Sequence, residues 1–183
     1  MRPPRTELRL RLREGTAESH NRIDRRMGSL DLTSVDGLAR LLGAHWLVQS
    51  LFEAELGEDA AFGFLPLLRA DLRALGRPAP EWTAAPHVSN VDPLGYRYVV
   101  AGSQLGGRLL HRDWNQARDE AVRAAGRYLT ANLRSRAWPD FLAETRERTF
   151  DPNEEARILR SANRVFEVYD AAATELGIGI GHN

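Results

Sequence analysis

The chain has 183 residues with 25 basic and 25 acidic side chains, a formal net charge of zero, and neither cysteine nor lysine. This length fits one domain with a substantial core, and the balanced charge argues against a general binder of nucleic-acid backbones. The absence of cysteine excludes disulfides, thiolate metal sites and cysteine nucleophiles, and the absence of lysine excludes Schiff-base and P-loop chemistry.

No segment has the pattern of a signal peptide or the roughly 18 to 20 apolar residues of a membrane span. We therefore expect a soluble, cytoplasmic protein that binds neither nucleic acid nor membranes. Helical periodicity dominates the chain and predicts an all-α fold of six to eight helices. We expect one helical domain over residues 1–176 and a flexible C-terminal tail over residues 177–183.

Three helices are predicted in the N-terminal half. Residues 6–26 contain leucines that alternate with arginines, which is a strand signal, but a lone strand would have no partner, so we predict one helix. A capping box at residues 33–36 predicts the start of a second helix that ends near residue 55. A third helix is expected over residues 64–75. Residues 76–93 contain four prolines and are expected to form a loop that packs over the domain.

The C-terminal half also follows a helical pattern. Residues 98–110 are expected to be helical although they contain three glycines, and further helices are expected over residues 115–133 and 138–148. The clearest start signal is Asp151, followed by proline at the first helical position and glutamate at the third. This last helix is expected to stop at Gly177.

Three features could carry chemistry, and each has a structural alternative. His20 is either an exposed helix residue or an axial haem ligand, which needs a neutral imidazole nitrogen and an apolar wall. The glycines at 102, 106 and 107 allow either close helix packing or the approach of a flat ligand to the backbone. The arginine clusters are either solvated faces or sites that bind carboxylates through the bidentate guanidinium group. His45, beside Trp46, is expected to be a core histidine.

Two motifs resemble the haem oxygenase family. Residues 12–20 (LREGTAESH) resemble the proximal-helix motif of that family, and residues 98–107 (YVVAGSQLGG) resemble its distal helix. The distal motif is closest to the bacterial form, including the branch associated with bacteriophytochromes. The helix that begins at Asp151 resembles the closing helix of the family. The resemblance implies a single-domain helical bundle with haem between a proximal helix and a kinked, glycine-rich distal helix.

The resemblance also implies roles for individual residues. His20 would bind the haem iron, and Arg13 would pair with a haem propionate. Arg146 or Arg148 would be a second propionate-binding residue. The distal wall of the catalytic site would be formed by four residues, namely Gly102, Ser103, Gly106 and Gly107.

The implied reaction is the oxidative opening of haem to biliverdin with release of CO and iron. Haem would be both substrate and prosthetic group, O2 the oxidant, and a reductase or ferredoxin-type protein the electron donor. A bacteriophytochrome would be a possible recipient of biliverdin. The family often has an acidic residue where this chain has Ala101 or Ser103, so a non-catalytic haem carrier or sensor of the same fold is the alternative. A thiaminase-like hydrolase or a di-iron oxidase is disfavoured, because cysteine and Glu-x-x-His motifs are absent.

Overall fold

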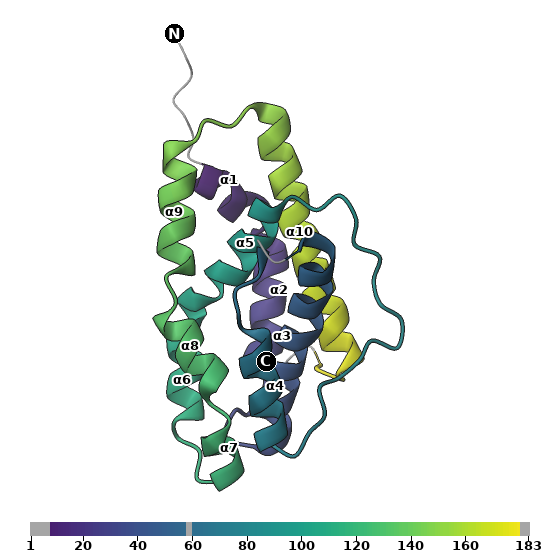
Figure 1. Cartoon of the computed structure of the whole chain (residues 1–183), viewed down its shortest axis with the longest axis vertical. Helices are drawn as coiled ribbons and strands as arrows, with labels where there is room; N and C mark the ends of the chain where they lie inside the picture. Colours follow the sequence, from purple (N-terminus) through teal and green to yellow (C-terminus); the bar gives the residue numbers. More distant parts are fainter. Residues whose placement is uncertain (1–7, 58–59, 180–183) are drawn as a thin grey trace.

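The structure is a computed structural model that describes residues 8–57 and 60–179. Its regular elements are all α-helices (Figure 1). The described residues form ten helices: α1 (Leu8–Gly15), α2 (Ala17–Gly28), α3 (Val35–Leu56), α4 (Leu65–Ala74), α5 (Pro93–Gly102), α6 (Gln104–Trp114), α7 (Glu120–Ala124), α8 (Arg127–Arg134), α9 (Ala137–Glu147) and α10 (Pro152–Glu175). The all-α prediction is therefore confirmed, whereas the predicted number of helices was too low.

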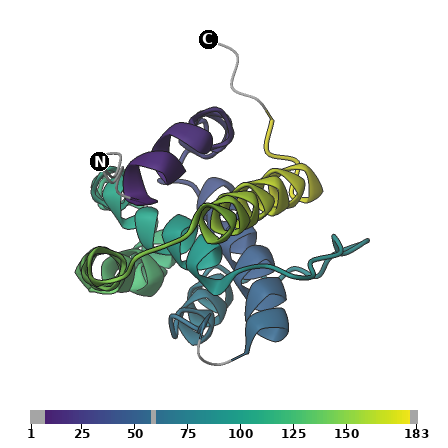
Figure 2. The ribbon, with the colours of Figure 1, turned by 90° about the horizontal axis from the view of Figure 1, so that it is seen from above.

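The last helix, α10, is the centre of the bundle. Viewed from above, it lies between the α1–α2 segment on one side and α3 on the other (Figure 2), and it packs against α1, α2, α3 and α5. Its inner face is fully buried at positions such as Ile158, Ala162 and Val165. The predicted start is confirmed, because Asp151 accepts hydrogen bonds from the backbone of the first turn and Glu154 completes the capping box.

Helix α5 crosses α10 at unusually short range because residue 95 is glycine. A Cβ atom at Gly95 would lie 2.6 Å from the Cβ of Ser161 and 2.7 Å from the backbone of Ile158. The start of α5 is fixed to the same helix, since the backbone N–H of Asp92 donates to the Ser161 hydroxyl at 2.8 Å. The Asp92 carboxylate also pairs with Arg157 at 3.0 Å. These contacts place α5 firmly over the central helix.

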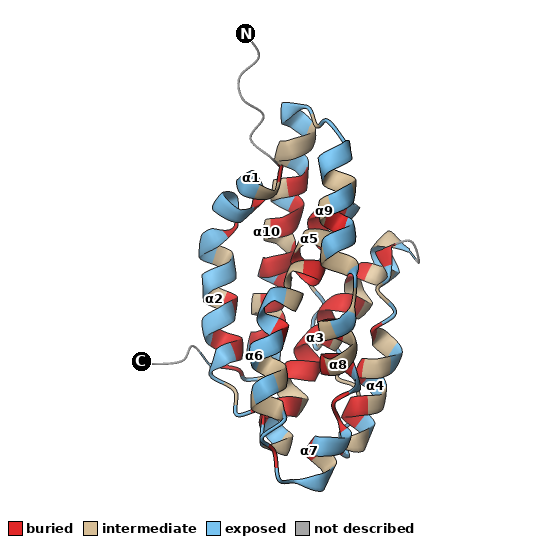
Figure 3. Cartoon of the chain, turned by 90° about the vertical axis from the view of Figure 1, so that its left-hand side faces the viewer, coloured by how far each residue is buried: buried red, intermediate tan, exposed pale blue. Residues whose placement is uncertain are grey.

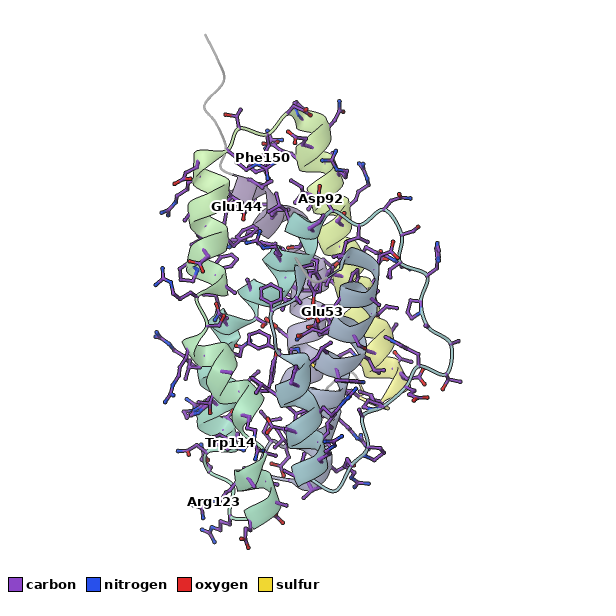
Figure 4. The ribbon with its side chains drawn as sticks, viewed as in Figure 1. Glu53, Asp92, Trp114, Arg123, Glu144 and Phe150 are labelled. Atoms are coloured by element: carbon purple, nitrogen blue, oxygen red, sulfur yellow. The ribbon has the colours of Figure 1, made fainter. Side chains whose placement is uncertain are left out.

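The α5 and α9 helices are joined by an ion pair. Arg97 donates to the carboxylate of Glu144 at 2.6 Å, and Figure 4 labels Glu144 on the inner side of α9. At the same junction the rings of Trp138 and Phe141 stack, and the ring of Tyr98 contacts both of them at a tilt. Helix α9 is thus fixed beside α5.

The proline-rich segment between α4 and α5 passes across α3 and α10, as predicted. The Trp46 indole N–H donates to the carbonyl of Pro80 at 3.1 Å, and that of Trp82 donates to the carbonyl of Leu47 at 3.3 Å. On the other side, the Thr83 backbone N–H donates to Glu175 on α10 at 3.1 Å.

Three predicted helices are each divided in the structure, and one of them, over residues 98–110, is divided at Ser103 into parts of α5 and α6. The expected helix over residues 6–26 bends at Thr16, whose hydroxyl donates to the carbonyl of Leu12 at 2.7 Å, an interaction that bends helices. The expected helix over residues 115–133 is instead α7 and α8, with α6 ending just before it. Gly126 lies at the break between them. Only glycine fits at this position, because the ring of Trp114 occupies the space that a side chain would need.

Two predicted boundaries also differ from the structure. The N-cap of α3 is Ser34, whose hydroxyl accepts from the N–H of Gly37 at 3.0 Å, so the predicted capping box at Thr33 was wrong by one residue. Residues 180–183 of the expected tail (177–183) lie outside the described residues, whereas Ile178 is only 2% exposed. The Nε–H of Arg26 donates a hydrogen bond to the carbonyl of Ile178 at 3.1 Å. His182 lies outside the described residues.

Candidate functional site

A cavity of about 490 Å³ lies between α2 and the α5–α6 pair. Figure 3 shows α2 and α6 beside each other on one side of the molecule. The volume falls in the range of roughly 300–1,000 Å³ that is usual for small-molecule sites. Side chains from α3, α9 and α10 close the remaining sides. Most lining side chains are apolar, including Ile23, Met27, Leu41, Val99, Leu105, Leu109, Leu110, Trp138 and Phe166.

His20 stands on the α2 wall of this cavity. Its Nδ1 atom lies 3.1 Å from a carboxylate oxygen of Asp24, one helical turn further along α2. Its ring makes an edge contact with Phe166, at 5.8 Å between centroids. Asp24 was not among the residues singled out from the sequence, although its spacing of four residues from a histidine could have indicated it. Because Asp24 engages Nδ1, the Nε2 atom is the nitrogen that remains for an iron ion.

The opposite wall is formed where α5 ends and α6 begins. Gly102, Ser103 and Gly106 all line the cavity, as the resemblance implied. A Cβ atom at Gly106 would meet nothing within 4 Å, so this stretch of wall is bare backbone. Gly107 is different: it is buried on the far side of α6, where a Cβ would lie 2.9 Å from Oδ1 of Asn132. The expectation that Gly107 belongs to the wall was therefore wrong, and its role is to let α6 pack against α8.

The bend between α5 and α6 is held by side-chain hydrogen bonds. The Ser103 hydroxyl donates to the carbonyl of Val100 at 2.7 Å, and it accepts from Asn132 at 3.2 Å. Gln104 fastens the first turn of α6 to its neighbours, because its amide donates to the carbonyls of Asn132 and Ser135 at 2.6 and 2.7 Å. Gln104 was not among the residues predicted from the sequence. No local signal could have found it, since its partners come from other helices.

Tyr98 is a polar residue of the cavity wall that is influenced by arginines of α1. Tyr98 lines the cavity, and burial raises the pKa of its hydroxyl. A hydrogen bond with Thr16 and the charges of Arg13 and Arg9 act on the pKa of Tyr98 in the opposite direction. Arg13, on the exposed face of α1, therefore lies near Tyr98, but it is not among the residues that line the cavity.

The structure does not bring the other two predicted arginines to the cavity. Arg148 lies at the end of α9, where it is 3.8 Å from both Glu144 and Glu154 and covers the ring of Phe150. Arg146 is exposed in the last turn of α9 and does not line the cavity. The expectation that Arg146 or Arg148 binds a propionate was therefore not confirmed. The reason is that α9 contributes to the cavity through Trp138, near its start, and both arginines lie at its other end.

A second histidine, His45 on α3, also reaches the cavity. It is 7% exposed, and its Nδ1 lies 3.0 Å from the hydroxyl of Tyr169. Burial lowers the pKa of His45 to about 4, so its imidazole is neutral at pH 7. The prediction of a hydrogen-bonded core histidine is confirmed, with the addition that one edge faces the cavity. His87 and His111 are not among the lining residues.

The residues that line the cavity fit a flat, mostly apolar ligand that carries an iron ion. An oriented imidazole stands on one wall, and the opposite wall combines apolar side chains with a stretch of bare backbone at Gly106. Haem has this combination of properties.

The described helices include none that is long and apolar enough to cross a membrane.

Comparisons with known proteins point the same way. No protein-family model matches the chain. Its sequence is 30% identical over 102 residues to a heme oxygenase of Xanthomonas campestris pv. campestris (strain 8004), a match that covers 56% of this chain and 62% of that protein. The matched segment thus spans less than two thirds of the relative's length.

The structure matches the heme oxygenase of Neisseria meningitidis, which was solved with NO and CO bound, with a TM-score of 0.68. That match covers 97% of this chain and 96% of the other at 18% sequence identity, so it establishes the fold. Both matches are to proteins named heme oxygenase, and the structural match confirms the predicted fold.

Proposed function

We propose that the protein is a haem oxygenase that opens haem to biliverdin with release of CO and iron. The observation that carries this proposal is the pairing of His20 with a bare backbone wall across one apolar cavity. Bound haem would supply both the redox-active iron and the ring that is opened, with O2 as oxidant.

In this proposal each wall has a distinct task. His20 binds the iron through Nε2, and Asp24 fixes the orientation of the imidazole through Nδ1. Gly102 and Gly106 let the ring lie close to the backbone and leave space for a small molecule beside it. The apolar side chains exclude bulk water from the reacting groups.

Tyr98 and Arg13 would bind the propionates and so orient the ring within the cavity. A reductase or ferredoxin-type electron donor, and a bacteriophytochrome that accepts biliverdin, stay predictions from the family resemblance.

The proposal is tested by adding hemin to the protein and then a reductant in air. We expect a Soret band on binding, its decay after reduction, and the absorption spectrum of biliverdin as product. A stable Soret band without product would favour the haem carrier or sensor instead. If hemin produces no spectral change, the cavity is not a haem site.

The ligand assignment is tested by replacing His20 with alanine. The His20→Ala variant should lose turnover and have a shifted Soret band, since His20 is the only histidine on α2. His87→Ala is the matched control, because His87 is exposed in the loop before α5 and does not line the cavity. A His20→Ala protein with the spectrum and turnover of the control would refute the assignment.

A further inference from the structure

The side chain of Gln104 joins three helices at the corner where the distal wall begins. Gln104 is the first residue of α6 and is half-buried. Its amide N–H groups donate to the carbonyls of Asn132 and Ser135 at 2.6 and 2.7 Å. Its carbonyl accepts the backbone N–H of Trp138 at 2.9 Å. Both donors and the acceptor of this amide are thus engaged by backbone groups of α8, α9 and the segment between them.

The three partners lie at helix ends, where some backbone groups have no partner within the helix. Asn132 belongs to the last turn of α8, Ser135 directly follows that helix, and Trp138 belongs to the first turn of α9. Helix α9 receives no side-chain cap from its own N-cap residue, Arg136. The amide of Gln104 therefore takes the place of a peptide group at the corner between α8 and α9.

This corner is itself fixed in the bundle. At the other end of α8, the fully buried carboxylate of Asp71 on α4 accepts the backbone N–H of Tyr128 at 2.8 Å and pairs with Arg127 at 3.1 Å. Helix α9 is fixed beside α5 by the ion pair described above. Gln104 thus ties the first turn of α6 to a part of the structure that is held from two sides.

The distal wall needs such an attachment because it contains little that would hold it by packing. Gly102 and Gly106 stand on either side of Gln104, and a Cβ atom at Gly106 would meet nothing within 4 Å. Glycine leaves the backbone more conformational freedom than any other residue. Gln104 is not among the residues that line the cavity, so its side chain anchors the wall without facing the ligand.

The same side chain also fixes a second part of the cavity surface. Trp138 lines the cavity, and its ring would lie 3.7 Å from a Cβ atom at Gly102. The backbone N–H of Trp138 is the group that the Gln104 carbonyl binds. One amide therefore holds the bare backbone of α6 and the indole of α9 in a fixed relation to each other.

We propose that Gln104 is a positioning residue that sets the distance between the bare backbone of the distal wall and the ring of the bound ligand. This role rests on the proposed function, in which the ligand is haem. Gln104 acts through the backbone at Gly106 and through Trp138. A displacement of about 1 Å in the alignment of reacting groups can cost roughly 100-fold in rate, so a loosened wall should slow turnover while hemin still binds.

The first measurement uses the haem-free protein. Gln104→Met keeps a side chain of similar length but removes its three hydrogen bonds. Amide hydrogen exchange over residues 103–107 and 137–139 should become about tenfold faster or more, because these segments open more easily. Gln116→Met is the matched control, since Gln116 is exposed in the segment after α6. Exchange at the wild-type rate in Gln104→Met would overturn the proposal.

The second measurement uses hemin-loaded protein that is reduced under CO, with CO as a probe of the space beside the ring. In Gln104→Met the C–O stretching band should broaden or split, because the wall no longer has one position. Hemin affinity should be unchanged, since Gln104 does not line the cavity. The kcat for haem opening should fall about tenfold or more. A single narrow band together with wild-type kcat would overturn the proposal.

A second variant, Gln104→Glu, separates positioning from a general loss of packing. Its carboxylate can accept the N–H of Trp138 but cannot donate to the two carbonyls, whose partial negative charges raise the pKa of the carboxyl group. Protonation restores one donor, so the C–O band should narrow toward that of the wild type as the pH falls from about 8 to about 6. A band that is equally broad at both pH values would show that packing alone is responsible and would overturn the proposal.

Failure of the proposed function would look different. A wild-type protein that binds hemin without opening it would refute haem oxygenase activity, while amide exchange and the C–O band would still decide whether Gln104 fixes the wall. A wild-type protein that binds no hemin would overturn both proposals, because the cavity would then hold no ring.

Discussion

Two adjacent glycines at the start of α6 are expected to respond in opposite ways to substitution. Gly106 faces the open cavity, where a Cβ would meet nothing within 4 Å, whereas a Cβ at Gly107 would lie 2.9 Å from Oδ1 of Asn132. Glycine within a helix costs roughly 0.5–1 kcal/mol relative to alanine. For a chain of this size that corresponds to a rise in melting temperature of roughly 1 to 4 °C for Gly106→Ala.

Gly107→Ala should instead destabilise the protein. Asn132 must move away from the new methyl group, which breaks its bond to Ser103. Overpacking together with the loss of a buried hydrogen bond costs about 1–3 kcal/mol, more than the helix propensity gained. Thermal unfolding of the ligand-free protein measures both variants on one scale.

The same position offers a test of the cavity as the haem site. Gly106→Leu should keep the melting temperature of Gly106→Ala to within a few degrees, but its side chain would stand in the space of the ligand. A steric conflict of about 1–3 kcal/mol corresponds to a loss of hemin affinity of roughly 5- to 150-fold. Hemin binding by Gly106→Leu at wild-type affinity would refute the assignment of α6 as the distal wall. A Gly107→Ala protein more stable than the wild type would refute the packing argument.

Three further outcomes are expected. Asp24→Ala should weaken hemin affinity or turnover by roughly 10- to 100-fold, as is usual when the partner of a metal-binding histidine is removed. Asp24→Glu should restore part of the lost affinity or turnover. Spectra and rates equal to those of the wild type in both variants would show that the Asp24 contact is dispensable. Between pH 6.5 and 4 the unfolded chain binds a proton at His45, whereas the folded protein keeps this histidine neutral. The free energy of unfolding should therefore fall by about 3 kcal/mol from pH 6.5 to pH 4. In urea titrations of His45→Gln, the free energy of unfolding should change less with pH over the same range. Arg26→Met should lower the free energy of unfolding by about 2–3 kcal/mol. The reason is that the buried guanidinium group donates hydrogen bonds to Asp170 at 2.9 Å and to the carbonyl of Ile178. An unchanged melting temperature would contradict this account of the C-terminal segment.

The sequence by itself determined the local part of this protein. The capping box at Asp151 and the apolar stripe after it predicted α10 because both signals lie within a few residues of each other. The all-α class followed from periodicity, and the two motifs that contain His20 and Ser103 predicted which helices face each other across the cavity. These are properties of short segments, and short segments are where sequence patterns are informative.

The tertiary structure decided what depends on contacts between distant segments. The break between α7 and α8 follows from Trp114 packing against Gly126, and the burial of Ile178 follows from Arg26 on another helix. The different tasks of Gly106 and Gly107, adjacent in sequence, arise only because α8 packs on one side of α6 and the cavity opens on the other. Arg146 and Arg148 fell outside the site for the same reason, since the direction of α9 in space is set by its partners.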